Sequence, residues 1–286
     1  MLGKLVRLIR SSNSTPASQH PLLPRILAAV GNEIGEAKGF AEQLIPAAEA
    51  ALNYFENEIA SIPGSQELAT DRLADGSSLA SLFADSDDIG RALGRSLAVK
   101  EALPALIKSG CDEIHALLGM RLKSTNAAGT AMPPVFADHT LRSLAGDAGT
   151  TRELLRLAAF DRLLLDFAEH VGKLRRKDRM LKIEWEWNLQ HDAARVMAAE
   201  PQAEYVYAAN ELTPENQLKG LLTWLSTPEC FFRLEPANAS ASGQPSLPQL
   251  RCSDRRHWLV CLVRFSADDA IAALERETHN HRYILI

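Results

Sequence analysis

The sequence predicts a mainly α-helical protein with a C-terminal α/β module. The first observation is that apolar residues recur at steps of three and four in two long segments, 23–55 and 157–185. Such steps are typical of a helix that buries one seam against another helix. The second is that short apolar runs, separated by helical patterns, replace this period after residue 200. We therefore expect a long helical hairpin or coiled coil, followed by a ferredoxin-like βαββαβ sandwich.

The composition is that of a folded protein, and 286 residues are enough for about two domains. The chain is 46% hydrophobic and 23% charged, which argues against wholesale disorder. Its apolar runs are too short for the roughly 20 residues of a membrane-spanning helix. The four cysteines are widely spaced and form no CxxC pair, so we expect neither a disulfide framework nor a zinc knuckle. These features predict a cytoplasmic protein.

Residues 1–21 form a basic amphipathic segment and a polar linker. Leu5 and Leu8, together with Arg7 and Arg10, have the pattern of a short helix that lies on a membrane surface. A basic segment without acids is also typical of a mitochondrial transit peptide, and a helix this short could equally dock on protein. The sequence leaves these three interpretations open.

Residues 22–149 are predicted to form a helical domain. A first long helix should begin near Pro24, kink or break at Pro46 and stop by Pro63. Glycines at positions 31, 35 and 39 would give this helix a smooth ridge for tight packing. Short helical pieces should fill 66–122, one of them capped by Ser86. The irregular stretch 123–149 should mark the domain boundary.

Residues 150–200 are predicted to be one long helix. Thr150 and Glu153 have the spacing of a capping box, and only Gly172 interrupts the pattern before Pro201. This helix should pair with the first helix or with its own copy. Residues 201–286 should form the α/β module, with strands at 205–208, 230–234, 257–265 and 281–286 and with helices at 213–224 and 266–277.

Searching the sequence for chemistry finds no Walker A, GxGxxG, GxSxG or HExxH motif. Cys111 and His115, four residues apart, could offer two metal ligands on one helical face, but zinc needs three or four. Asp138–His139 lies in the irregular stretch without a nucleophile at known spacing, and the 279–281 triplet HNH lies in an expected turn. We predict no catalytic residue, no metal site and no cofactor.

The leading functional hypothesis is a non-enzymatic structural or adaptor protein that acts through helix-mediated self-association or protein binding. One alternative is a peripheral membrane protein anchored by Leu5, Arg7, Leu8 and Arg10. The other is a nucleic-acid-binding protein, because the stretch 173–182 is basic and tryptophans follow it. The residues predicted to bind a protein partner are Leu164, Phe167, Val171, Leu174, Leu181 and Trp185. Those predicted to bind nucleic acid in the alternative are Lys173, Arg175, Arg176, Lys177, Arg179 and Lys182.

Overall fold

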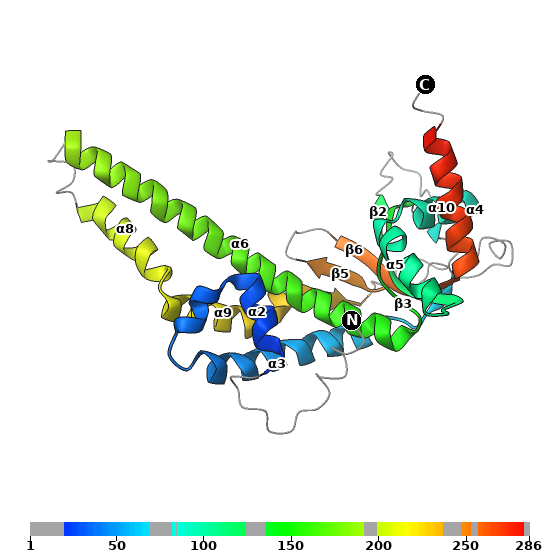
Figure 1. Cartoon of the computed structure of the whole chain (residues 1–286), viewed down its shortest axis with the longest axis horizontal. Helices are drawn as coiled ribbons and strands as arrows, with labels where there is room; N and C mark the ends of the chain where they lie inside the picture. Colours follow the sequence, from blue (N-terminus) through cyan, green and yellow to red (C-terminus); the bar gives the residue numbers. More distant parts are fainter. Residues whose placement is uncertain are drawn as a thin grey trace, which may run out of the picture. The chain divides into compact units, whose positions relative to one another are not determined.

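The computed structural model describes residues 20–68, 82–83, 85–123, 135–191, 199–236, 247–252 and 257–282, and its elements are shown in Figure 1. The chain divides into two compact units. The first unit combines Met1–Tyr54 with Ala158–Pro228, and the second combines Phe55–Leu157 with Glu229–Ile286. The protein is mainly α-helical with an α/β part, as predicted. The contiguous domains expected from the sequence stay a prediction.

The first unit is helical. It contains helix α2 (Leu22–Val30), the 3-10 helix η2 (Asn32–Glu36) and most of α3 (Phe40–Ala60). It also contains the larger part of α6 (Ala148–His191), then α8 (Ala199–Glu211) and α9 (Pro214–Leu225). Thr213 caps α9 by accepting a hydrogen bond from the backbone N–H of Asn216, at the position that the sequence indicated.

The single first helix predicted from Pro24 to Pro63 is wrong, because two glycines interrupt it. Gly31 has a φ of 105° and Gly39 has a φ of 67°, backbone conformations that residues other than glycine rarely adopt. They separate α2 from η2 and η2 from α3, so these glycines end helices and do not form a packing ridge. Pro46, where we expected a kink or break, lies inside α3, which runs through it without a break.

Helix α6 is the long helix that the sequence predicted. Its 44 residues span about 66 Å at a rise of 1.5 Å per residue. The cap differs from the predicted Thr150–Glu153 box, because the helix begins two residues earlier. The Asp147 carboxylate accepts hydrogen bonds from the Thr150 N–H at 2.8 Å and from the Thr150 hydroxyl at 2.7 Å. Both hydrogen bonds lower the pKa of Asp147 below its ordinary value, and the bond from the Thr150 hydroxyl has the larger effect.

This cap makes a pH-dependent contribution to stability. Because the folded-state pKa of Asp147 is lowered, its contribution is present above the ordinary pKa of about 3.9 and is lost as the pH falls through the folded-state value. We expect Asp147→Ala to lower the free energy of unfolding by about 1 kcal/mol at pH 7, and by less at pH 3. Urea denaturation at both values measures this, and an equal loss at pH 3 would contradict the assignment. Asp147→Asn, which keeps a capping acceptor, should retain most of the stability at pH 7.

The second unit is built around a mixed sheet. In the described residues its strands are β1 (Gln66–Glu67), β2 (Glu113–Lys123), β3 (Val135–Ala145), β4 (Phe232–Glu235), β5 (Gln249–Cys252) and β6 (His257–Ser266). The order is β3-β2-β6-β5-β4, with antiparallel neighbours, and β1 adds a short parallel pairing to β6. The strand predicted at 257–265 is confirmed as β6.

Several predicted elements of the helical domain and of the α/β module are wrong. Residues 113–123 and 135–145 form strands where helical pieces and an irregular stretch were expected, and residues 205–208 lie in helix α8 where a strand was expected. The final strand predicted at 281–286 is also wrong at its start, because helix α10 (Ala267–Arg282) includes residues 281 and 282. Residues 283–286 lie outside the described residues. The ferredoxin-like arrangement is therefore not confirmed.

Three helices cover one face of this sheet: α4 (Ser86–Arg95), α5 (Leu97–Lys108) and α10. Their apolar side chains share a core with alternate residues of β2, among them Ile114, Leu118 and Met120. The N-cap of α4 is Asp85, which accepts a hydrogen bond from the Asp88 N–H at 2.8 Å, and not the predicted Ser86. The predicted helix at 266–277 is confirmed, with the Ser266 hydroxyl accepting from the Asp269 N–H at 3.0 Å.

Both edges of the sheet are modified in ways that discourage pairing with another strand. At the β4 edge, the Glu58 carboxylate accepts a hydrogen bond from the Leu234 N–H at 2.6 Å. At the β3 edge, the pairing with β2 shifts twice, between His115 and Leu117 and again between Gly119 and Arg121. Asp138 and Ser143, which have positive φ angles of 57° and 55°, are the extra residues at these two bulges.

Candidate functional site

The first half of the predicted partner-binding seam is buried inside the first unit. Leu164, Phe167 and Val171 are at most 3% exposed. The Phe167 ring meets Trp224 of α9 edge to face, with ring centroids 5.4 Å apart, and Gly220 of α9 lies where a Cβ would be 3.4 Å from the Phe167 ring. These three residues stabilise the unit by packing against its own helices.

The second half of the predicted seam is half-buried. Leu174, Leu181 and Trp185 are each of intermediate exposure, and α8 lies beside the distal part of α6 in Figure 1. The Lys177 ammonium lies 3.2 Å from the Glu204 carboxylate of α8. Nearer the start of α6, the Arg25 guanidinium of α2 donates two hydrogen bonds of 2.5 Å to Asp161. The long helix therefore packs against α2, α8 and α9 of its own chain, whereas the predicted coiled coil is not confirmed.

A different face of α6 carries large apolar side chains that are exposed. Met180 is 67% exposed, Ile183 is 55% exposed and Trp187 is 56% exposed. Their spacing of i, i+3 and i+7 places them within about 60° of arc on a helix of 3.6 residues per turn. On the same geometry Leu174, Leu181 and Trp185 lie on roughly the opposite side. We call Met180, Ile183 and Trp187 the outer face of α6.

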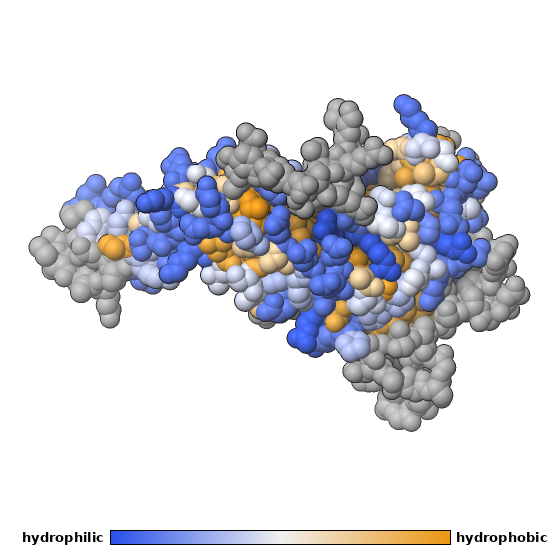
Figure 2. Space-filling view, turned by 90° about the horizontal axis from the view of Figure 1, so that it is seen from below, coloured by the Kyte–Doolittle hydropathy of each residue, from blue (hydrophilic) through white to orange (hydrophobic). Residues whose placement is uncertain are grey.

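The distal part of α6 has a largely polar surface. Figure 2 shows mostly hydrophilic residues over the distal parts of α6 and α8, at the left of the view, with only small apolar spots. Among the six predicted nucleic-acid-binding cations, Arg175 forms an ion pair with Glu33 and Lys177 with Glu204. The other four are exposed and have no acidic partner in the described parts of the chain: Lys173, Arg176, Arg179 and Lys182. Exposed cations without an acidic partner among the described residues therefore lie near the apolar outer face.

The predicted membrane-surface residues Leu5, Arg7, Leu8 and Arg10 lie outside the described residues. Within the parts of the chain that the structure describes, no helix is long and apolar enough to cross a membrane.

The polar candidates for chemistry make structural contacts. His115, on β2 and not on the expected helix, hydrogen-bonds Ser65 at 2.8 Å and Glu113 at 3.1 Å. His139 Nε2 donates to the Leu82 carbonyl at 2.9 Å, and its ring stacks on Phe83. The 279–281 triplet belongs to helix α10 and not to the predicted turn. In the described residues no three Cys, His, Asp or Glu side chains gather as metal ligands.

The cysteines divide by exposure. Cys261 of β6 is buried, and burial raises the pKa of its thiol to about 12, so it behaves as a small apolar residue. Cys230, in contrast, is exposed.

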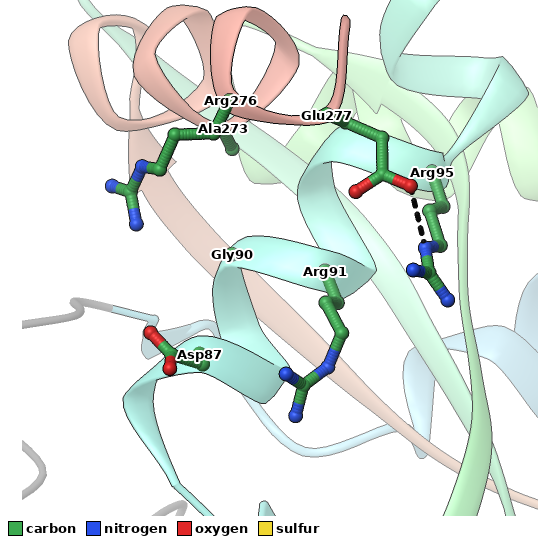
Figure 3. A pocket seen from close by; sticks show the side chains of 7 residues that line it. All are labelled: Asp87, Gly90, Arg91, Arg95, Ala273, Arg276 and Glu277. Carbon is green, nitrogen blue, oxygen red and sulfur yellow. Dashed lines mark hydrogen bonds and ion pairs between the residues drawn. The ribbon is translucent and has the colours of Figure 1, made fainter. Parts of the chain in front are cut away.

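One pocket of about 320 Å³ lies between α4 and α10 in the second unit (Figure 3). Three arginines line it, but two are engaged by acids of the same helices. Arg91 lies 2.6 Å from the Asp88 carboxylate, and Arg95 lies 2.8 Å from Glu277. Asp87 also lines the pocket, so its charges largely cancel and it does not form a strongly positive anion site.

The outer face is the candidate functional site, and the sequence interpretation missed it. The signal was present as the i, i+3, i+7 spacing of Met180, Ile183 and Trp187. The more regular leucine seam on the other side of the helix was chosen as the binding surface. The comparison with protein-family models found no match, and the comparisons with curated proteins and with solved structures found none either.

Proposed function

We propose that this protein is a structural or adaptor protein that binds another protein through the outer face of α6. The observation that carries the proposal is the exposure of Met180, Ile183 and Trp187 on one stripe of a 44-residue helix. Exposed apolar side chains at helical spacing are the anchors of helix-in-groove and helix-pairing interfaces. Burial of a Met or Ile side chain contributes about 1.5 to 3 kcal/mol, and somewhat less when the side chain begins partly buried.

The flanking charges favour an acidic partner surface. Arg176, Arg179 and Lys182 are exposed within one turn of the apolar stripe, and none has an acidic partner among the described residues. A partner helix that has carboxylates beside an apolar stripe would match both properties. The altered edges of the sheet support the choice of α6, since the Glu58 carboxylate and the two β3 bulges disfavour strand addition.

The second candidate function is nucleic-acid binding, favoured by the four exposed cations of the stretch 173–182 and by the exposed Trp187 indole. It predicts an affinity that falls steeply with salt, whereas an apolar interface is much less sensitive. The membrane-surface alternative rests on residues 1–12, outside the described residues, and stays a proposal. Liposome flotation with and without residues 1–12 tests it.

The test is crosslinked affinity purification of the full chain from its native host, with and without nuclease, analysed by mass spectrometry. We expect a nuclease-resistant protein partner in stoichiometric amount, either a different protein or a differently tagged second copy of this chain, and we expect it to be lost when Met180→Glu and Ile183→Glu are combined. The matched control is Leu165→Glu, because Leu165 is also on α6 and 50% exposed but lies 18 residues before Ile183, about 27 Å away along the helix. Retention of the partner by the double variant would contradict the proposal. Nuclease-sensitive recovery, abolished by Arg176→Ala with Arg179→Ala, would favour the second candidate.

A further inference from the structure

We infer that the partner of the outer face is a second copy of this chain, bound in antiparallel orientation and centred on Ile183. This inference deepens the proposed function and rests on it. The three outer-face residues are spaced almost symmetrically about Ile183, with Met180 three residues before it and Trp187 four residues after it. An antiparallel two-fold pair therefore places Ile183 against its own copy and Met180 against Trp187 of the copy.

The charged residues on one flank of the outer face also match an antiparallel pair centred on Ile183. Arg179 and Glu186 are both exposed and neither has an ion-pair partner among the residues described. At 3.6 residues per turn they lie within about 20° of each other around the helix, on the same flank of the outer face. In an antiparallel pair the same flanks of the two helices meet, so Arg179 of one copy lies opposite Glu186 of the other, twice by symmetry.

A parallel pair would also place Arg179 near an acid, Glu184 of the copy, but its overall charge pattern is less favourable. It would align the basic stretch from Lys173 to Lys182 with the same stretch of the copy and would stack Trp187 on Trp187. The antiparallel pair instead moves the two basic stretches apart along the helices and brings each toward the acidic turn that contains Glu184 and Glu186. Like charges that face each other destabilise association, so the charge pattern selects the antiparallel orientation.

The interface is small. Three apolar anchors on each side bury less than the roughly 1,200 Å² that stable complexes usually bury. The dimer should therefore form reversibly, with a dissociation constant on the order of 10 μM. The average molar mass of the protein in solution should therefore rise with its concentration.

The experiment is analytical ultracentrifugation of the full chain at protein concentrations below and above this dissociation constant. Ile183→Glu places two carboxylates at the symmetry centre and is expected to raise the dissociation constant at least about tenfold, since it removes the central contact and adds repulsion. Leu165→Glu, the control on the same helix, is expected to leave it unchanged. Circular dichroism checks that each variant retains its helix content.

A charge exchange tests the orientation. Arg179→Glu alone and Glu186→Arg alone should each weaken the dimer by about tenfold, and the two together should restore it, because each new pair is again complementary. In a parallel pair Arg179 would face Glu184 of the copy, so restoration by Arg179→Glu with Glu184→Arg, and not with Glu186→Arg, would overturn the antiparallel inference.

The failures are distinguishable. A chain that remains monomeric at every concentration, or a dimer that survives Ile183→Glu, overturns the self-association inference. If the outer-face variant still loses a crosslinked heterologous protein in that case, the proposed function stands with a different partner. If the outer-face variant loses no crosslinked protein, both the self-association inference and the proposed function are wrong.

Discussion

Replacing Arg152 by alanine is expected to lower the free energy of unfolding by about 2 to 4 kcal/mol. Arg152 Nη2 donates to the Ile62 carbonyl at 2.9 Å, and Nη1 donates to the Ile59 carbonyl. Ile59 lies in the last turn of α3 and Ile62 just after it, where a helix leaves carbonyl groups without helical partners. The Ile59 carbonyl also accepts a hydrogen bond from the Ile62 N–H at 3.1 Å. A charged donor contributes about 1.5 to 3 kcal/mol per hydrogen bond, and the substitution removes one such bond from each carbonyl, beside the buried side chains of Ile59 and Ile62.

Burial lowers the pKa of the Arg152 guanidinium, which still carries its charge at neutral pH because arginine titrates so far above it. Urea denaturation followed by far-ultraviolet circular dichroism measures the loss. Arg162→Ala is the matched control, since Arg162 is 56% exposed and forms only an i, i+4 pair with Asp166. It should cost less than about 1 kcal/mol. Equal losses for the two variants would show that Arg152 does not stabilise the end of α3.

The elements that the sequence predicted well are those with strong local signals. Helix α9 has a capping threonine followed by a proline, and α10 has Ser266 followed three residues later by an acid. Strand β6 has nine consecutive residues in which valine, leucine and aromatic side chains predominate between turn-forming segments. Each of these patterns is completed within a few residues, so no distant part of the chain is needed to interpret it.

The elements that were missed depend on distant partners. Strand β2 pairs with β6, which lies more than 130 residues later, and its alternating burial of Ile114, Ala116 and Leu118 competes with a helical interpretation of the same letters. The residues at 205–208 are aromatic and branched, as in a strand, but they lie in α8 beside α6. Tertiary packing decided both cases.

The same limit applies to the predicted partner-binding seam. Both sides of distal α6 carry apolar residues, and the sequence alone cannot say which side other helices cover. Phe167 and Val171 are buried because α9 and other segments of the first unit pack there, whereas Met180 and Ile183 lie on a side that remains exposed. Periodicity alone therefore predicted a seam of which Leu164, Phe167 and Val171 lie in the core.

Replacing Gly94 by alanine is expected to destabilise the second unit, because α4 and α10 cross closely at this residue. A Cβ at Gly94 would lie 2.6 Å from the Ala273 carbonyl oxygen and 3.3 Å from Cβ of Glu277. The clashing atom is backbone within a helix and cannot move without shifting α10. Overpacking of this kind costs about 1 to 3 kcal/mol, which exceeds the gain of at most about 1 kcal/mol from replacing a helical glycine by alanine.

Gly90 provides the matched control, since it lies one turn earlier in α4. A Cβ there would meet only Arg276 Nη1, the end of a flexible side chain, at 3.6 Å. Gly90→Ala should therefore stabilise by up to about 1 kcal/mol through helix propensity alone. The two substitutions remove the same hydrogen atom and add the same methyl group, so the gain from helix propensity cancels between them. A difference of about 1 to 3 kcal/mol in urea denaturation therefore measures the contact between α4 and α10 itself. If both variants gain stability equally, the two helices do not approach each other at Gly94.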